Sequence, residues 1–313
     1  MGCGGGQTGR VLERTWRPPW PLDVARVLGV HRRGHGDPAY RVAGDGAVWR
    51  ASTTPDGPVS VRIVSRPRGG EVHATAYGPG AAWQLDALPE LLGAADDPGS
   101  LVPVHPQVTD GVRRLPGLRV GRSRRVFESL VPAVLEQKVV GLEAFRAWRL
   151  LLRRFGEPAP GPHELRLVVP PPPEVWMKVP SWEWHRAGAE AVRARTVIGA
   201  ARVAARLEET LELPAEEADR RLRSLPGVGV WTSAEVRQRA HGDADAVSVG
   251  DYHIPSMVAW SLVGERKADD ARMLELLAPY AGHRHRVAML LMGSGGTPPR
   301  RGPRNPVRDY RRI

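Results

Sequence analysis

The sequence predicts an α+β fold in which a small N-terminal antiparallel sheet precedes an all-α half. Three observations support this prediction. Hydrophobic residues alternate with period two in segments between residues 47 and 77, which is typical of half-buried strands. From residue 126 onward they recur at the spacing of a helix face. Within this helical half, the run Leu225-Pro226-Gly227-Val228-Gly229 has the residue types of a tight turn, which predicts a helix-hairpin-helix.

The N-terminal domain is predicted over residues 21–112, after a loose leader at residues 1–20. A helical piece is expected around residues 86–92. Glycine and proline clusters with turn chemistry separate the predicted strands. These strands cover residues 47–51, 59–64 and 71–77.

The helical domain is predicted over residues 113–295, and a basic tail over residues 296–313. The last fourteen residues hold six arginines against the single acidic residue Asp309. Glycine and proline punctuate the helical pattern and set the expected ends of the helices. The expected helices cover residues 126–140, 142–155, 189–211, 214–222, 269–280 and 283–292, with shorter ones opening at 181, at 230 and after 251.

The chain is strongly basic, with a net charge of +11 and a sequence pI of about 10.7. Such a balance suits a polyanionic partner such as DNA, because neutralisation of phosphates supplies sequence-independent affinity. A genomic bias toward arginine is the alternative explanation. Cys3 is the only cysteine, which excludes an internal disulfide and a cysteine-ligated iron–sulfur or zinc site within one chain. We expect a cytoplasmic, nucleoid-associated protein without a signal peptide or membrane span.

The hairpin has the features of a phosphate-binding turn. Pro226 fixes one backbone dihedral, and Gly227 and Gly229 allow positive φ and a close approach of bare backbone to another surface. A helix that begins near Val230 would present free N–H groups toward the turn, where a DNA phosphate fits. The alternative is an ordinary tight turn between two helices, with glycine at the C′ position.

Asp251 follows Gly229 by 22 residues and precedes Pro255. Because proline belongs in the first turn of a helix, Asp251 is expected at or just before a helix N-terminus. The simplest interpretation is a capping carboxylate, but such a carboxylate can also face a cleft. There it would stabilise an oxocarbenium-like sugar and orient water for cleavage of a glycosidic bond.

The hairpin and the Asp251 segment together resemble a known protein family. Leu225–Gly229, Trp231-Thr232 and Gly250-Asp251-Tyr252 resemble the helix-hairpin-helix DNA glycosylase superfamily, nearest its 3-methyladenine DNA glycosylase II branch. Val134-Leu135-Glu136-Gln137 is a weaker match. The resemblance implies a two-lobed all-α glycosylase core with an added N-terminal domain, and Asp251 as the catalytic carboxylate. It also implies a monomer that binds double-stranded DNA with damaged bases and needs no cofactor or metal.

The other candidate residues come from the chemistry of the hairpin, from the resemblance and, for Trp182, from a cluster of tryptophans at residues 176–184 that could stack on a base. DNA-binding residues are expected at Pro226, Gly227, Val228, Gly229, Thr232, Gln137 and Lys138. Walls of the base pocket, which would receive a flipped-out base, are expected at Trp231, Tyr252 and Trp182, although core packing is the alternative for Trp182.

Three positions depart from the family pattern. Trp231 stands where bifunctional members carry a Schiff-base lysine, so no lyase activity is expected. Glu235 replaces an aromatic residue, and Lys138 replaces an apolar residue that wedges into DNA. The expected function is therefore monofunctional hydrolytic release of alkylated bases at the start of base excision repair. The alternatives are a non-catalytic DNA-binding protein and a glycosylase for oxidised or deaminated bases.

Overall fold

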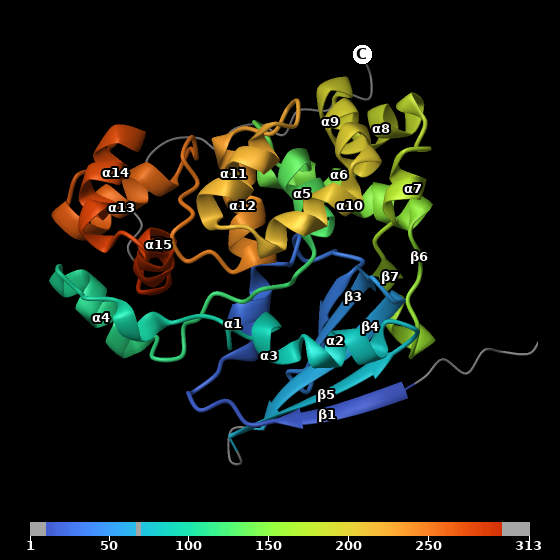
Figure 1. Cartoon of the computed structure of the whole chain (residues 1–313), viewed down its shortest axis with the longest axis horizontal. Helices are drawn as coiled ribbons and strands as arrows, with labels where there is room; N and C mark the ends of the chain where they lie inside the picture. The colour runs from blue at the N-terminus through green and yellow to red at the C-terminus, as the bar shows by residue number, and fades with distance from the viewer. Residues whose placement is uncertain (1–10, 67–69, 296–313) are drawn as a thin grey trace, which may run out of the picture.

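The computed structural model describes residues 11–66 and 70–295 and consists of a sheet at one end and helices over the remainder (Figure 1). The sheet is antiparallel, with the spatial order β1-β5-β4-β3-β2. Its strands are β1 (Val11–Trp16), β2 (Tyr40–Val42), β3 (Val48–Thr54), β4 (Gly57–Arg66) and β5 (Glu71–Tyr77). The predicted fold class, with its N-terminal antiparallel sheet, is confirmed.

Three short helices cover one face of the sheet: α1 (Val24–Gly29), α2 (Ala81–Asp86) and α3 (Leu88–Leu91). Alternate residues of the strands, such as Val61, Ile63 and Ala74, are buried and pack against leucines of these helices. The period-two pattern in the sequence therefore marks the side of each strand that faces this core.

The prediction of a loose leader is wrong for residues 11–16, which form the edge strand β1. This strand pairs along β5, with Val11 opposite Tyr77 and Trp16 opposite Val72. Leu12 and Trp16 are half-buried against the sheet core, so β1 satisfies the free edge of β5 and also buries apolar surface. Residues 1–10 and 296–313, which include the predicted basic tail, lie outside the described residues.

The first helical lobe follows the sheet domain and is built around a core that contains Leu130, Trp148, Trp176 and Val197. Two short strands, β6 (Glu157–Pro158) and β7 (Val168–Val169), join it to β3 and β4. Its helices are α5 (Val126–Leu135), α6 (Gly141–Phe155), α7 (Pro173–Trp176), α8 (Ser181–Ala187), α9 (Ala191–Arg202), α10 (Ala204–Glu208), α11 (Ala215–Arg223) and α12 (Val230–Val236), continued by a π-helical turn at Arg237–His241.

The second lobe has a separate core around Val108, Val258, Met273 and Val287. It contains α4 (Pro106–Arg114), α13 (Ile254–Val263), α14 (Asp270–Leu277) and α15 (Arg284–Gly293). The domain boundary predicted at residue 112 therefore falls inside α4, and α4 packs on α15 rather than on the sheet. Val108 draws this helix into the second lobe, because its fully buried side chain belongs to that core.

Two predicted helices end earlier than expected. The helix that begins at Val126 ends at Leu135 instead of residue 140, and Lys138 then adopts a left-handed backbone with φ of 53°. The helix expected over residues 189–211 is broken at Val203, where φ of −120° separates α9 from α10. Apolar periodicity continues across both breaks, so it could not reveal them.

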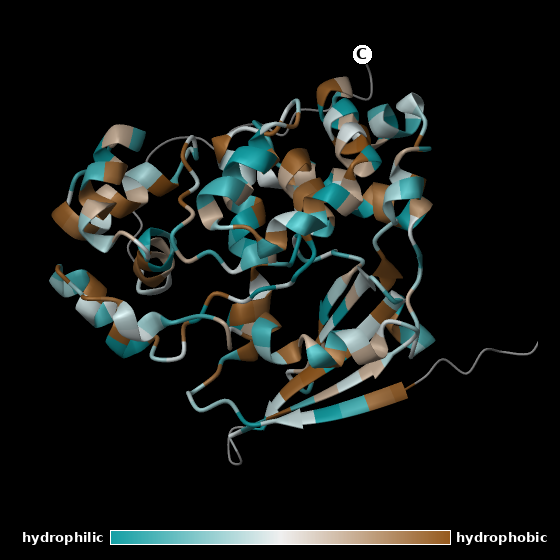
Figure 2. Cartoon of the chain, in the orientation of Figure 1, coloured by the Kyte–Doolittle hydropathy of each residue, from teal (hydrophilic) through white to brown (hydrophobic). Residues whose placement is uncertain are grey.

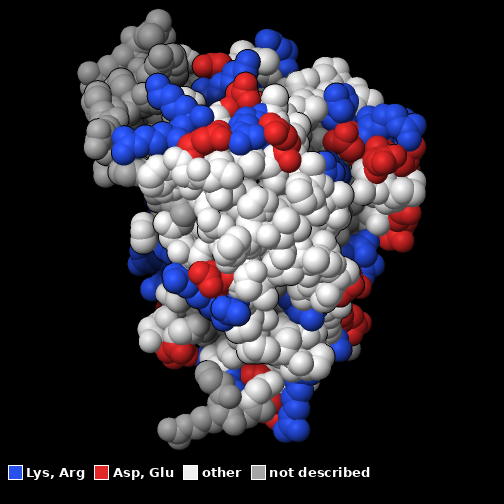
Figure 3. Space-filling model, turned by 90° about the vertical axis from the view of Figure 1, so that its left-hand side faces the viewer, with Lys and Arg blue, Asp and Glu red and all other residues white. Residues whose placement is uncertain are grey.

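Hydrophilic and hydrophobic residues alternate around most helices in Figure 2, as expected for helices with one buried face. Figure 3 faces the end of the molecule that carries α4, α13 and α14 in Figure 1. On this end, basic and acidic side chains are mixed in two regions, and a broad uncharged band lies between the two regions. The net positive charge therefore does not form a uniform basic surface here. No helix in the described part of the chain combines the length and apolar character needed to cross a bilayer.

Candidate active site and nucleic-acid interface

The predicted hairpin is formed by α11, a turn at residues 224–229, and α12. The turn closes with a hydrogen bond from the Val228 N–H to the Leu225 carbonyl, 3.0 Å between N and O. Gly227 has φ of 87°, a left-handed conformation that glycine adopts without strain. Gly229 is extended and immediately precedes α12, which no side chain caps. Pro226, Gly227 and Gly229 are exposed, so their backbone is accessible to a ligand.

The side chains of two predicted DNA-binding residues support the hairpin from inside. Val228 is buried in the core of the first lobe. Thr232 is also buried, and its hydroxyl accepts a hydrogen bond of 2.8 Å from the Gln137 amide. Their side chains therefore anchor the hairpin to its core, and contact with DNA at these two positions, predicted through the backbone of the hairpin, stays a prediction.

Gln137 links the end of α5 to the hairpin. Its Nε2 donates to the Gly227 carbonyl at 2.9 Å as well as to Thr232. The backbone carbonyl of Gln137 accepts two hydrogen bonds, of 3.1 and 2.9 Å, from the buried guanidinium of Arg193. The Gln137 side chain therefore braces the turn. The next residue, Lys138, is exposed.

Gly227 and Gly229 provide a matched pair for testing the hairpin. A Cβ at position 227 would lie 2.1 Å from Thr196 Oγ1, whereas a Cβ at position 229 meets open space. Gly227→Ala is expected to destabilise the protein by about 1–3 kcal/mol, because alanine resists positive φ. Gly229→Ala should keep the wild-type urea midpoint yet weaken duplex binding, because a methyl group then stands on the exposed turn. Equal stability of the two variants would contradict this account.

Asp251 lies two residues before the N-cap of α13. Its Oδ1 accepts hydrogen bonds from the N–H groups of His253 at 2.7 Å and Ile254 at 3.0 Å. Its Oδ2 accepts a bond of 3.3 Å from the indole Nε1 of Trp231. The carboxylate therefore caps a helix and at the same time touches the first turn of α12. The capping and functional interpretations are compatible, and the side chain keeps partial exposure.

The segment that carries Asp251 is fixed by a buried polar network. Ser248 donates to Glu235 Oε1 at 2.6 Å and accepts from Gln238 Nε2 at 2.9 Å, and the Asp251 N–H donates to the Ser248 carbonyl. Arg239 donates to Glu235 Oε2 at 2.7 Å. Burial by itself raises the pKa of Glu235, but Arg239 and the Ser248 hydrogen bond outweigh it and hold this pKa below the ordinary value.

Glu235 therefore anchors the Asp251 segment to α12, a role that the sequence did not reveal. The only feature of the sequence that pointed to an unusual role for this position was a carboxylate where the family pattern has an aromatic residue. Because the Glu235 side chain is buried and both its oxygens are occupied, it does not offer a flat stacking surface.

Of the three predicted walls of a base pocket, Trp231 contacts Asp251, Tyr252 follows Asp251 in the chain, and Trp182 lies on another helix. Trp231 is partly buried and contacts Asp251. Tyr252 is 82% exposed and packs edge-on against His253, with 4.9 Å between ring centroids. Trp182 is 65% exposed on α8, at the opposite side of the molecule from α13 (Figure 1). The prediction that Trp182 lines a pocket with Asp251 is wrong, because helix periodicity could not show which lobe surface this side chain faces.

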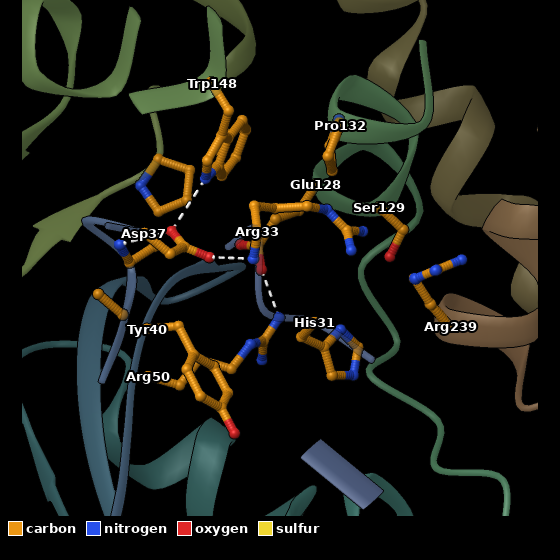
Figure 4. A pocket seen from close by; sticks show the side chains of 13 residues that line it. His31, Arg33, Asp37, Tyr40, Arg50, Glu128, Ser129, Pro132, Trp148 and Arg239 are labelled. Atoms are coloured by element: carbon orange, nitrogen blue, oxygen red, sulfur yellow. Dashed lines mark hydrogen bonds and ion pairs between the residues drawn. The ribbon is translucent and has the colours of Figure 1, made fainter. Parts of the chain in front are cut away.

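Two recesses lie away from Asp251. A groove of about 510 Å³ separates α8 from α9 and is lined by Trp184, Ala194 and Ile198. A small cavity of about 30 Å³ lies where the sheet domain meets α5 and α6 (Figure 4). Asp251 and Trp231 line neither of them.

The small cavity is a polar junction between domains. In Figure 4, Asp37 accepts from the Trp148 indole at 2.9 Å and from the backbone N–H of Arg33 at 2.7 Å. Burial, together with Arg50 and other nearby arginines, lowers the pKa of His31 well below its ordinary value, which keeps its ring neutral at pH 7. The volume suits about one water molecule rather than a substrate, so the junction is structural. Among the described residues, no cluster of histidine, cysteine and carboxylate side chains is arranged to hold a metal.

Comparison with solved structures identifies the fold. The chain is similar to a 3-methyladenine DNA-glycosylase from Archaeoglobus fulgidus, with a TM-score of 0.73 and 20% identity over 90% of this chain and 98% of that one. It is also similar to an 8-oxoguanine glycosylase/lyase of Clostridium acetobutylicum in complex with double-stranded DNA. The TM-score is 0.69 and the identity 13%, over 90% of this chain and 96% of that one. The 3-methyladenine DNA glycosylase of Schizosaccharomyces pombe, in complex with abasic DNA, has a TM-score of 0.50 and 18% identity over 60% and 90%.

No protein-family model matches the chain, and no curated protein sequence matches it. The similarity is therefore one of structure at low sequence identity. It covers nine-tenths of the chain for the first two structures and includes the sheet domain as well as both helical lobes. The chain has the fold of the helix-hairpin-helix DNA glycosylases that carry an N-terminal sheet domain.

Proposed function

We propose that this protein is a DNA N-glycosylase that hydrolytically releases alkylated bases of the 3-methyladenine type and so initiates base excision repair. The observation that carries the proposal is the contact between Asp251 and Trp231, which joins a carboxylate to α12, the helix that follows the exposed turn. The turn offers a contact for a DNA phosphate, and the carboxylate offers a negative charge for cleavage of an N-glycosidic bond.

In the proposed mechanism the exposed backbone of the turn at residues 226–229 holds a DNA phosphate and positions the duplex without reading its sequence. The damaged nucleotide leaves the base stack, and Trp231 forms part of the surface that receives it. Tyr252, being exposed, is available to stack on DNA next to the site. The protein acts as a monomer on double-stranded DNA in the nucleoid and needs no cofactor.

Asp251 then stabilises the positive charge that develops on the sugar and orients the attacking water. An alkylated purine already carries a positive charge and leaves readily, so one carboxylate suffices. Position 231 offers an indole and no amine, so we propose that the base-release step forms no covalent bond to the protein and ends at an abasic site.

A second candidate, a glycosylase for oxidised bases, is supported by the similarity to the 8-oxoguanine enzyme. Both candidates use the same carboxylate and hairpin, and they differ in the surface that receives the base. Glu235 is buried where the family pattern has an aromatic residue, so that position offers no stacking surface to the base. Which base the site accepts therefore depends on the remaining residues around Asp251.

A base-release assay on matched duplexes tests the proposal. Methylated, deaminated and oxidised bases are placed at the same position in one sequence, and the free base is measured by chromatography at short reaction times. We expect release from the methylated duplex, with the strand breaking at that position after treatment with hot alkali. Release of oxidised bases alone would establish the second candidate. Tight binding without release of any base would indicate a non-catalytic DNA-binding protein and contradict both.

A further inference from the structure

The loop that joins α1 to β2 carries two arginines, two histidines and one aspartate within residues 31–37. The aspartate, Asp37, is buried, and its oxygens accept hydrogen bonds from the Trp148 indole and from two backbone N–H groups (Figure 4). Arg33 is buried as well and forms an ion pair with Glu136, 3.2 Å between Nε and Oε1. The one carboxylate of the loop therefore points into the protein, and the outer side of the loop carries basic groups.

The outer side of this loop brings two guanidinium groups against bare backbone. Arg32 is half-buried and donates to the Gly34 carbonyl at 3.2 Å and to Nδ1 of the exposed His35 at 3.1 Å. Arg149 of α6 approaches from the helical lobe, and its Nη1 lies 2.9 Å from the position that a Cβ on Gly36 would take. Within the part of the chain that the structure describes, neither Arg32 nor Arg149 forms an ion pair with a carboxylate. Both guanidinium groups can therefore take an anion from outside the chain.

Three consecutive backbone N–H groups, at residues 34–36, add donors to the same surface. None of them donates a hydrogen bond to another described residue. Gly34 has φ of 76°, a left-handed conformation that makes the loop turn sharply at this point. Backbone N–H groups in such a turn form anion-binding concavities, and arginine is the side chain best suited to phosphate, which it can hold with two parallel hydrogen bonds. The donors of the loop therefore suit a phosphate group.

The end of α5 connects this loop to the hairpin. Glu136, the partner of Arg33, is followed directly by Gln137, whose amide donates to the Gly227 carbonyl at 2.9 Å. Consecutive Cα atoms lie only about 3.8 Å apart, so one place in the fold holds the loop of the sheet domain with one residue and the hairpin with the next. A duplex that rests on the exposed turn at residues 226–229 therefore has the loop beside it.

We propose that residues 32–36 and Arg149 form a second phosphate-binding site, by which the sheet domain holds the DNA backbone next to the hairpin. This inference deepens the proposed function and rests on it only in taking DNA as the partner. The phosphate oxygens accept hydrogen bonds from Arg32, from Arg149 and from the N–H groups of the loop. Such contacts fix the position of the duplex and read no sequence. The sheet domain thereby takes part in DNA binding.

The salt dependence of binding to an undamaged duplex tests this proposal. Fluorescence anisotropy gives the association constant at a series of NaCl concentrations, and each neutralised phosphate contributes about 0.9 to the slope of log K against log[salt]. The double variant Arg32→Gln, Arg149→Gln is expected to reduce the steepness of this slope by about 0.9 and to weaken binding about tenfold at low salt, because one phosphate contact is lost.

The double variant Arg202→Gln, Arg206→Gln is the matched control, since it removes the same net charge elsewhere. Both arginines are exposed, at the end of α9 and on α10. They lie near the opposite end of α5, where Glu208 of α10 accepts from the Val126 N–H at 2.8 Å. The control should keep the slope of the wild type.

A second pair of variants changes the site without removing an arginine. Gly36→Asp places a carboxylate against Arg149, where it competes with the phosphate, and should weaken duplex binding about tenfold at low salt. Gly36→Ala introduces the same Cβ without charge. Because the nearest atoms to this Cβ belong to the flexible end of Arg149, Gly36→Ala should bind like the wild type. The urea midpoints of all variants are measured alongside, and this second pair decides the question if the double variant at the loop fails to fold.

Three results would overturn the inference: no duplex binding by the wild type, equal slopes for the loop variant and its control, or equal binding by Gly36→Asp and Gly36→Ala. An undamaged duplex contains no base to release, so the slope is measured independently of the base-release assay. A protein that releases bases with an unchanged slope would refute the second phosphate site alone. A protein whose slope falls as expected but which releases no base would refute the proposed function alone.

Discussion

Replacing Asp251 with asparagine is expected to abolish base release while duplex binding persists. Asparagine keeps an oxygen that can accept from His253 and Ile254, so the cap of α13 survives. It lacks the negative charge that opposes the developing charge on the sugar. Losing such a preorganised electrostatic contact typically costs about 10²–10³ in rate. Single-turnover release of a methylated base, with anisotropy for binding, measures both effects.

Asp269→Asn is the matched control for this experiment. Asp269 caps the neighbouring helix α14 by accepting from the Arg272 N–H at 2.9 Å, so the substitution makes the same chemical change at a similar structural position. Its base release should equal that of the wild type. If Asp251→Asn also retained wild-type release, the assignment of Asp251 as the catalytic carboxylate would be wrong.

Replacing Asp96 with alanine is expected to cause the largest loss of stability. Asp96 follows α3, and its two oxygens pair with the guanidinium of Arg286 on α15. The side chain of Asp96 is 4% exposed and that of Arg286 is 2% exposed. Asp96 Oδ2 also accepts from the Val120 N–H at 2.9 Å. Removing the carboxylate leaves a buried guanidinium without its partner, which costs about 3–5 kcal/mol.

The free energy of unfolding in urea measures this loss. Glu265→Ala is the control, because Glu265 pairs with Arg272 in a partly exposed position and its removal should change the midpoint far less than the loss of Asp96. A double change, Asp96→Ala with Arg286→Met, should recover part of the loss since no unpaired charge remains. A single variant as stable as the wild type would show that the Asp96–Arg286 pair does not join the sheet domain to the second lobe.

Local backbone chemistry explains why the hairpin and Asp251 were predictable. Glycine at position 227 permits positive φ, and proline at position 255 favours the first turn of a helix, in which it lies here. Residues whose role depends on a distant partner were not predictable in this way. The sequence did not show, for example, that the Gln137 amide donates to the Thr232 hydroxyl, which lies 95 positions further along the chain.

The sequence by itself determined the fold class, the hairpin and the position of Asp251 before α13, because alternation, helical spacing and turn residues act within a few positions of the chain. Tertiary structure alone decided that β1 completes the sheet, that Glu235 anchors the Asp251 segment, and that Trp182 lies far from it. These outcomes depend on which surfaces meet when two lobes and a sheet pack together, and no local pattern in the sequence encodes that choice.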